Sequence, residues 1–436
     1  MTVAEAATSD RLPAPRGDGD AARTMTVAYY SPGWPPGLVP NGVVSYVGNL
    51  RQGLLAQGGV RPWVVTPSIT GETGGHRDVF VLPRPGTKGL LARCTDAVRR
   101  RMNPDPLGIR GRIRRLAGAI DHLRRNENLD LFEIEDAFGI AHSLAPRARV
   151  PIVVRLHGPC FLTGSGWRSG GGEAAMRRRN DDERLGLLAA SAVTAPSAHV
   201  LQATREHFGL ELPNARVIHN PILPVAPEHK WSLDHCEANH ILYVGRFESV
   251  KGGDVVIDAF ARIAARHPTC RLTFVGPDKG CVDGDGKRWL LREYVSAKLP
   301  RSAQERFEWL DFQPHDRIAV LRQRAMVTLV PSRYETFGLA AVEALAAGCP
   351  VVASNAGGLG EVVRDGHNAV VARSEDPDDF AEKVLSLLER PSHAAALGAR
   401  AAADTSRFHA DVIAAQSLAL YRDTIERFRH ARGKTS

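Results

Sequence analysis

Two glutamates interrupt the segment Pro331–Val352, which is otherwise almost wholly apolar in its second half. The run Leu339–Ala347 consists of strong helix formers, and Gly348 predicts the end of that helix. At 100° per residue, Glu343 lies about 40° from the first helical residue, beside the buried stripe, whereas Glu335 falls in the preceding loop. A buried carboxylate needs a cation or hydroxyl donors. Glu343 therefore either pairs with an arginine elsewhere or binds ligand hydroxyls.

An anion site is expected between these two glutamates. Gly338 precedes the helix, and the backbone N–H groups at a helix N-terminus attract anions. An anion flanked by hydroxyl-binding carboxylates describes a nucleotide sugar. Arg246 and Lys251 follow the expected strand His240–Val244 and suit a diphosphate. The alternative for this pair is two solvated loop cations.

Two more stretches place functional groups at expected element ends. Asn41, Gly42 and Val43 open an apolar helical pattern, and the glycine would let backbone N–H groups approach a phosphate. His157 ends the strand Ile152–Leu156 and could donate a hydrogen bond or hold a proton. Each has an ordinary alternative, a turn glycine and a structural histidine.

In order along the chain, these motifs resemble the retaining GT-B glycosyltransferases of glycosyltransferase family 4. The resemblance runs from about Met25 to the C-terminal helix. The matching pieces are NGVVSYVGNL (41–50), VVRLHGP (153–159), VTAPSAHV (193–200), VIHNP (217–221), YVGRFESVKG (243–252), and the E-x7-E block with the AGG that follows it. No single piece is decisive, but the ordered set is highly specific.

The resemblance implies a role for each matched residue. Arg246 and Lys251 would bind the donor diphosphate and stabilise the leaving group. Glu335 would bind sugar hydroxyls and Glu343 the ribose, while His157 would lie in the cleft close to the transferred sugar. The other expected donor contacts are Asn41, Gly42, Val43, Asn220, Gly245 and the backbone N–H groups of Phe337, Gly338 and Leu339.

Three carboxylates are candidates for the acceptor side. Glu133, Glu135 and Asp136 end the expected strand in LFEIEDAFG and could accept a hydrogen bond from an acceptor hydroxyl or amine. The family often has His-Asp at this point and two glycines where this chain has Asn41-Gly42. Both departures leave the acceptor open, including whether its nucleophile is oxygen, nitrogen or sulfur.

Two further features have a functional and a structural interpretation. The Asp283–Asp285 stretch (DGD) has the spacing of a metal-binding pair in another glycosyltransferase fold, but its Gly/Asp-rich context favours a solvated turn. The resemblance implies catalysis without a metal, and we expect no cofactor. The stretch Ile109–Arg125 predicts an arginine-lined helix that could dock on anionic lipid. Packing on its own domain is favoured, so membrane contact is not expected.

The elements that must position these residues follow a strand–helix alternation. Such alternation is typical of doubly wound parallel sheets. The expected strands of the first half are Thr26–Tyr30, Pro62–Thr66, Val79–Leu82, Leu131–Ile134, Ile152–Leu156, Ala192–Ala195 and Val217–His219. Those of the second half are His240–Val244, Arg271–Val275, Phe307–Leu310, Val327–Val330, Pro350–Ala353 and Ala369–Val371.

A Pro-rich stretch, Asn220–Pro227, separates the two sets of strands. The expected fold is GT-B: two Rossmann-like α/β domains that face each other across a cleft. The expected boundaries are a disordered tail (1–23), an acceptor domain (24–222), a linker (223–238), a nucleotide-sugar donor domain (239–408), and a C-terminal helix (409–436) packing back on the first domain.

Composition limits the function classes. The chain of 436 residues exceeds one ordinary core, and no run of eighteen apolar residues predicts a membrane span. The N-terminus lacks the pattern of a secretory signal, and six isolated cysteines suggest neither a zinc site nor a disulfide framework, so we expect a cytoplasmic protein. The net charge of +8 is compatible with nucleic-acid binding, but no aromatic–basic interleaving supports it.

The expected activity is transfer of a sugar from a nucleotide diphosphate sugar, UDP or GDP type, to a small-molecule acceptor with retention. The alanine- and arginine-rich usage hints at a GC-rich bacterium, where natural-product or cell-envelope glycosides are typical products. Two alternatives remain, a GT-B nucleotide-sugar epimerase and a non-catalytic nucleotide-binding paralogue. The sequence leaves the oligomeric state open.

Overall fold

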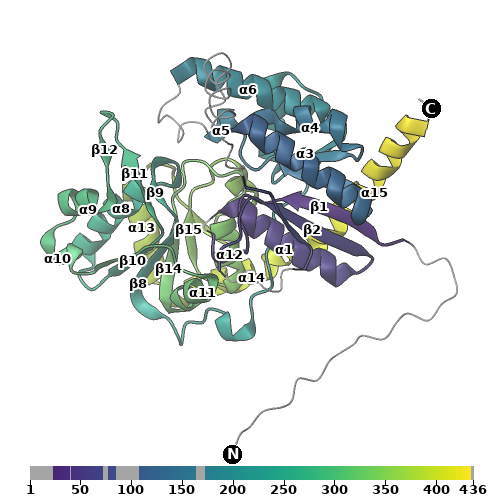
Figure 1. Cartoon of the computed structure of the whole chain (residues 1–436). Coiled ribbons are helices and arrows are strands. Elements are labelled where there is room, and N and C mark those ends of the chain that lie inside the picture. Colours follow the sequence, from purple (N-terminus) through teal and green to yellow (C-terminus); the bar gives the residue numbers. More distant parts are fainter. Residues whose placement is uncertain (1–22, 40, 72–76, 85–107, 164–171, 434–436) are drawn as a thin grey trace, which may run out of the picture.

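The first domain is built on a seven-stranded parallel sheet. The computed structural model describes residues 23–39, 41–71, 77–84, 108–163 and 172–433 (Figure 1). The strand order is β3-β2-β1-β4-β5-β6-β7. These strands are β1 (Met25–Tyr30), β2 (Val60–Thr66), β3 (Val79–Val81), β4 (Leu131–Glu135), β5 (Ile152–Arg155), β6 (Ala192–Ala195) and β7 (Ala215–Val217). The helical segments are α1 (Gly42–Gln57), α3 (Ile109–Asn126), η1 (Ala137–Gly139), α4 (Ile140–Ala148), α5 (Cys160–Thr163), α6 (Gly172–Ala189) and α7 (Ala198–Phe208).

The second domain has a six-stranded parallel sheet in the order β13-β10-β8-β14-β15-β16. Its strands are β8 (Glu237–Val244), β10 (Arg271–Val275), β13 (Phe307–Leu310), β14 (Ala325–Val330), β15 (Val351–Ala353) and β16 (Val370–Val371). Its helical segments are η3 (Pro227–His229), η4 (Ser249–Lys251), α8 (Gly253–Arg266), α9 (Leu291–Lys298), α10 (Arg301–Gln304), α11 (His315–Arg324), α12 (Leu339–Ala347), η5 (Gly358–Glu361), α13 (Pro377–Leu388), α14 (Pro391–Asp404) and η6 (Thr405–Phe408).

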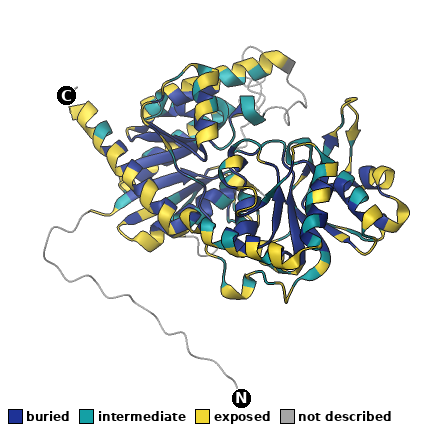
Figure 2. Cartoon of the chain, turned by 180° about the vertical axis from the view of Figure 1, so that it is seen from behind, coloured by how far each residue is buried: buried dark blue, intermediate teal, exposed yellow. Residues whose placement is uncertain are grey.

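Both sheets are buried on their two faces, as parallel sheets must be when crossover helices cover them. Figure 2 shows dark blue strands inside each domain and exposed residues on the outer sides of the helices. The predicted GT-B fold, with two parallel-sheet α/β domains, is confirmed. The predicted strands are confirmed with end shifts of up to three residues. β8 begins at Glu237 instead of His240, and β7 covers Ala215–Val217 instead of Val217–His219.

The chain crosses between the domains twice, and the two crossings lie side by side. The first runs from β7 to β8, and the second runs from α14 through η6 to α15 (Ala410–Gly433). Ile222 and His409 form an isolated parallel bridge, and the Ile222 N–H donates to the Phe408 carbonyl at 2.9 Å.

Helix α15 packs on α1 of the first domain and completes its core. Ile413, Leu418 and Ile425 are buried together with Val27 and Leu50. The approach is close: a Cβ on Gly53 of α1 would lie 2.1 Å from the Ala410 carbonyl oxygen. Figure 1 shows α15 leaving the second domain and lying along the first.

Two of the alternatives raised by the sequence are decided by packing. Helix α3 buries Leu116, Ile120 and Leu123 in the core of the first domain, so the expected packing on its own domain is confirmed. The predicted turn at Asp283 is also confirmed. Its carboxylate accepts the backbone N–H of Asp285 at 3.1 Å and the Trp289 Nε1–H at 2.7 Å, closing a hairpin of the small sheet β12-β11-β9.

That small sheet, formed by β9 (Phe247–Glu248), β11 (Asp278–Val282) and β12 (Arg288–Trp289), was not predicted, because its strands are short and rich in charged residues and glycine.

Residues 1–22 of the predicted tail lie outside the described residues. Among the helices described, none is long and apolar enough to span a membrane.

Candidate active site

The predicted sugar-binding carboxylate and the predicted diphosphate-binding lysine lie next to each other. Glu335 is in the loop after β14, and Lys251 is in η4, which follows β8 and the short strand β9. The Lys251 Nζ lies 2.7 Å from Glu335 Oε1, and the Ser332 hydroxyl donates to the same oxygen at 2.9 Å. Because β8 and β14 are neighbouring parallel strands, their carboxyl ends bring both loops to one edge of the sheet.

Glycines allow these two loops to come so close. The Tyr243 hydroxyl lies 3.0 Å from the Arg246 carbonyl and 3.2 Å from the Lys251 carbonyl, which braces the loop after β8. A Cβ on Gly245 would lie 2.5 Å from that hydroxyl oxygen, so a larger residue would displace the brace. Gly252 has φ +67°, and its Cβ would lie 2.1 Å from the Pro331 carbonyl oxygen.

The other predicted diphosphate ligand, Arg246, lies at the entrance of this loop. Its side chain is 48% exposed, and its Nη2 is 2.6 Å from Glu248 Oε1. Arg246 thus makes no direct contact with the Lys251–Glu335 pair. Because its side chain is half exposed, a bound anion can replace Glu248 as the partner of its guanidinium.

Helix α12 points its N-terminus toward the same edge of the sheet. Gly338 precedes it at φ +90°, and a Cβ there would lie 2.8 Å from Leu359 Cδ1. Within the described part of the chain, the backbone N–H groups of Phe337, Gly338 and Leu339 donate to no protein acceptor. Free amides at a helix N-terminus form an anion site.

The Phe337 side chain has a structural part in this arrangement. It is fully buried, its ring centroid lies 5.4 Å from that of His219 in a stacked geometry, and it meets Phe408 edge-on at 5.2 Å. Burial lowers the pKa of His219, which keeps this ring neutral in the stack. The aromatic anchor fixes the loop while its backbone amides stay open.

Glu343 forms the salt bridge that the sequence left as one of two alternatives. Its Oε2 accepts from Arg322 Nη2 at 2.8 Å, and the arginine is 7% exposed. The pairing explains how α12 tolerates a carboxylate among alanine and leucine. The Glu343 side chain keeps 22% exposure, which leaves it accessible to a ligand.

Across the domain boundary, His157 follows β5 in the first domain. Its ring meets Tyr46 edge-on with centroids 4.8 Å apart, and its backbone N–H donates to Asp136 Oδ1 at 3.0 Å. Burial, and then the nearby Arg155 guanidinium, holds the pKa of His157 well below its usual range. The imidazole is therefore neutral at physiological pH.

Two carboxylates lie at the end of β4, and one of them, Asp136, contacts the backbone of His157. Asp136 is 5% exposed and its Oδ2 has no hydrogen-bond partner among the described residues. Burial and the neighbouring Glu183 carboxylate raise the pKa of Asp136 to about 8. Glu135 lies 3.7 Å from Arg112, and burial raises its pKa in spite of that arginine.

Glu133 has a structural role, which corrects its assignment as an acceptor ligand. It is 3% exposed, the Tyr46 hydroxyl donates to Oε1 at 2.7 Å, and the Tyr421 hydroxyl donates to Oε2 at 2.8 Å. Its side chain points into the sheet–helix interface because strand residues alternate between faces. Both oxygens are bonded, and the carboxylate ties α15 and α1 to β4.

Asn220 and Asn41 make structural contacts. Asn220 is 6% exposed and accepts from Arg155 Nη2 at 2.7 Å, which ties the linker to β5. The exposed Asn41 is the N-cap of α1 and accepts from the Val43 N–H at 2.8 Å. A Cβ on Gly42 would meet nothing within 4 Å, so local packing places no demand for glycine there. A donor role for these residues remains a prediction.

Several site residues had no usable signal in the sequence. Arg322 belongs to a polar helix, and Ser332 is an ordinary loop serine. Glu361 meets α7 across the domain boundary, through the backbone N–H groups of Ala198 and His199. The partners of Arg322 and Glu361 lie on another helix or in the other domain, so no pattern of neighbouring residues in the sequence predicts these contacts.

Comparisons with known proteins agree with this architecture. The family model described as "Glycosyltransferase Family 4" matches residues 40–224, and the one described as "Glycosyl transferases group 1" matches residues 226–404. The chain is 32% identical over 287 residues to a glycogen synthase of Mycobacterium tuberculosis, covering 65% of this chain and 66% of the relative. It is 36% identical over 195 residues to a D-inositol 3-phosphate glycosyltransferase of Acidothermus cellulolyticus, covering 44% and 42%.

Solved structures show the same fold over nearly the whole chain. Sucrose-phosphate synthase from Thermosynechococcus elongatus superposes with a TM-score of 0.68 at 20% identity, covering 92% of this chain and 100% of that one. HepE from Anabaena, solved in complex with UDP and glucose, gives 0.64 at 20% identity, covering 91% and 98%. The two family models together match residues from 40 to 404, and on that basis the chain belongs to glycosyltransferase family 4 and has the GT-B fold.

Proposed function

We propose that this protein transfers a glycosyl group from a nucleotide diphosphate sugar to a small-molecule acceptor, with retention of the anomeric configuration. One observation carries the proposal: Lys251, Glu335 and the open N-terminus of α12 converge at the carboxyl edge of the second sheet. A cation and a helix N-terminus suit a diphosphate, and a carboxylate beside them suits sugar hydroxyls.

The donor would bind with its diphosphate over the α12 N-terminus. The amides of Gly338 and Leu339 would donate to phosphate oxygens, and Lys251 and Arg246 would neutralise them. Hydrogen bonds to charged groups contribute about 1.5–3 kcal/mol each. Glu335 would accept from the sugar hydroxyls and Glu343 from the ribose. The HepE structure with UDP and glucose favours a uridine nucleotide, with a guanosine nucleotide as the alternative.

The proposed chemistry occurs on one face of the sugar. The bond between the anomeric carbon and the diphosphate oxygen breaks, and the acceptor's nucleophilic atom bonds to that carbon from the same side. The proton of the acceptor passes to the departing phosphate oxygen. Preorganised charges at Lys251, Arg246 and the α12 N-terminus would stabilise the developing phosphate charge without a divalent metal.

The acceptor would enter from the first domain, near His157. The neutral imidazole can orient a hydroxyl of either substrate. At the end of β4, Asp136 accepts from the His157 backbone N–H and Glu135 pairs with Arg112. Because the end of β4 carries two carboxyl groups, we propose a polyhydroxylated or amino acceptor. Natural-product or cell-envelope glycosides are the products that we propose for such an acceptor.

Nucleotide binding is the first test. Melting temperatures would be measured with UDP, GDP, ADP and dTDP, each without metal and again with magnesium or EDTA, since a ligand of the folded state raises the midpoint. One nucleotide should stabilise the protein in EDTA. Stabilisation by none would contradict the proposed nucleotide diphosphate sugar donor.

The product decides between the remaining activities. The sugar nucleotide of the selected base would be incubated with candidate acceptors and followed by NMR of the anomeric signal. Transfer with retention is expected. A changed sugar nucleotide released without acceptor would indicate the epimerase, and an inverted product would exclude the same-face chemistry.

A further inference from the structure

Glu361 joins the donor domain to the acceptor domain. It ends η5 in the second domain, and its carboxylate accepts two backbone N–H groups of the first domain. Ala198 donates to Oε2 at 3.0 Å and His199 donates to Oε1 at 2.8 Å. These are the first residues of α7, so the carboxylate of one domain caps a helix of the other.

This contact is physically well matched. The first amides of a helix have no intrahelical acceptor, and the helix dipole favours a negative charge at that end. The N-cap residue Ser197 accepts from the Val200 N–H at 3.2 Å. Glu361 satisfies the two amides that the serine cannot reach.

A second cross-domain bond lies directly beside the first. The Ser197 hydroxyl donates to the carbonyl of Thr336 at 2.8 Å, and Thr336 is the residue after Glu335 in the donor loop. A Cβ on Gly358 would lie 2.1 Å from the Thr336 carbonyl oxygen and 2.6 Å from the Ser197 hydroxyl oxygen. Because residue 358 has no side chain, the loop that carries Thr336, the start of η5 and Ser197 at the N-terminus of α7 can come into contact.

The segment that carries Glu361 is continuous with the donor loop. Glu335 and Gly357 form a parallel bridge, and the Gly358 N–H donates to the Glu335 carbonyl at 2.8 Å. A displacement of η5 therefore displaces the backbone of Glu335, whose carboxylate pairs with Lys251.

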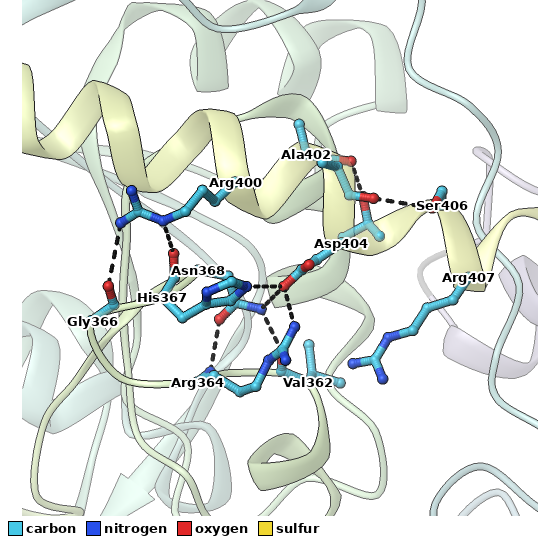
Figure 3. Close-up of polar contacts among 12 residues, drawn as sticks. Val362, Arg364, Gly366, His367, Asn368, Arg400, Ala402, Asp404, Ser406 and Arg407 are labelled. Atoms are coloured by element: carbon cyan, nitrogen blue, oxygen red, sulfur yellow. Dashed lines mark hydrogen bonds and ion pairs between the residues drawn. The ribbon is translucent and has the colours of Figure 1, made fainter.

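The other end of this segment is fixed to the interdomain crossing. Arg407 of η6 donates to the Glu361 carbonyl at 3.0 Å. Figure 3 shows the loop that follows, where Asp404 at the end of α14 accepts from Arg364, from Asn368 at 3.3 Å and from His367 at 3.0 Å. Hydrogen bonds thus hold both the Glu361 backbone and the loop that follows it.

We propose that Glu361 is a positioning residue for glycosyl transfer, which docks the donor loop on α7 and so sets the distance between the bound sugar and the acceptor domain. It touches neither substrate. The inference rests on the proposed function, because the distance that it sets matters only if the two domains bind the two substrates.

The test compares E361A and E361Q with wild type and with E382Q. Glu382 is an exposed glutamate of α13 whose partner, Arg266, belongs to its own domain. In E361A, the nucleotide affinity measured by calorimetry and the KM for the donor should stay within about twofold of the wild-type values. Its kcat should fall about 10- to 100-fold, because small misplacements of reacting groups lower rates by factors of that size. E361Q keeps one acceptor oxygen and should be intermediate, and E382Q should match wild type.

Hydrogen exchange of the amides of Ala198 and His199 gives a readout that does not require activity. Because Glu361 accepts from these two amides, their exchange should be slow in wild type and in E382Q and faster in E361A, with or without nucleotide. Unchanged kcat in E361A would overturn the inference. A loss of both nucleotide affinity and melting temperature in E361A would also overturn it, because it would indicate general destabilisation. If wild type transfers no sugar, the proposed function fails, and the exchange rates of these two amides in wild type and in E361A then test the docking contact by itself.

Discussion

Lys251 and Glu335 form an ion pair between two loops of the second domain, with 2.7 Å between Nζ and Oε1. The carboxylate is only about 10% exposed, and the Ser332 hydroxyl bonds the same oxygen. The lysine is thus held at the sheet edge by a carboxylate that is itself expected to bind the sugar. A bound diphosphate would compete for the same ammonium group.

Replacing Lys251 should weaken binding of the diphosphate selectively. K251A is expected to lower UDP affinity about 10- to 100-fold, because it removes one hydrogen bond to a charged group. Uridine affinity should stay nearly unchanged, since uridine has no phosphate. Calorimetry with UDP and uridine measures both. K279A, which removes an exposed lysine from β11, is the control, and equal losses for UDP and uridine would refute the diphosphate assignment.

Glu335 should affect turnover far more than folding. E335Q keeps the volume but removes the charge that binds the sugar and pairs with Lys251. We expect kcat/KM to fall about 10²- to 10³-fold, comparable to removing one preorganised contact to a transition state. The melting temperature should stay close to that of wild type. Turnover like that of wild type would refute the assigned role.

The two alternatives for Glu343 can be separated with a modified nucleotide. If it binds the ribose, wild type should prefer UDP over 2′-deoxy-UDP about tenfold, and E343Q should lose that preference. If it serves only as the partner of Arg322, E343Q should lower stability and keep the discrimination. Calorimetry with both nucleotides gives four affinities for the two proteins, and urea unfolding gives their two stabilities.

The hydroxyl of Tyr421 should stabilise the docking of α15. Y421F removes a hydrogen bond to the buried Glu133 carboxylate, which should lower the free energy of unfolding by about 1–3 kcal/mol. Y334F is a matched control, since the Tyr334 hydroxyl is buried without a partner among the described residues. Urea unfolding measures both, and equal effects would contradict the assignment of Glu133 as the anchor of α15.

Asp136 should make stability depend on pH in an uncommon direction. Its folded pKa of about 8 lies above the unfolded value of about 4, so the folded state holds a proton that the unfolded state releases. The free energy of unfolding should therefore fall as pH rises from about 4 to about 8. D136N keeps the acceptor for the His157 N–H and cannot ionise, so its curve should lack this contribution. Parallel curves for the two proteins would show that Asp136 is ionised throughout.

Much of the candidate site could be proposed from the sequence because family 4 motifs are local. Lys251, Glu335 and Gly338 each belong to a strand–loop–helix segment whose pattern is visible in the sequence, and parallel topology then brings the loops after β8 and β14 together. Glu133 was misassigned because a carboxylate near a strand end looks available for a ligand. Its two tyrosine partners, Tyr46 and Tyr421, are 87 and 288 residues away.

The sequence by itself determined the two α/β domains, the helix that follows Glu335, and the candidate donor residues, because hydrophobic periodicity and turn residues act over short stretches of chain. Only the tertiary structure decided how the polar side chains are used. It paired Glu343 with Arg322, buried Glu133 between two hydroxyls, and placed Glu361 on the N-terminus of α7 in the other domain. The physical reason is that a buried charge takes the partner that the fold brings within hydrogen-bond reach, and those partners lie on distant segments of the chain.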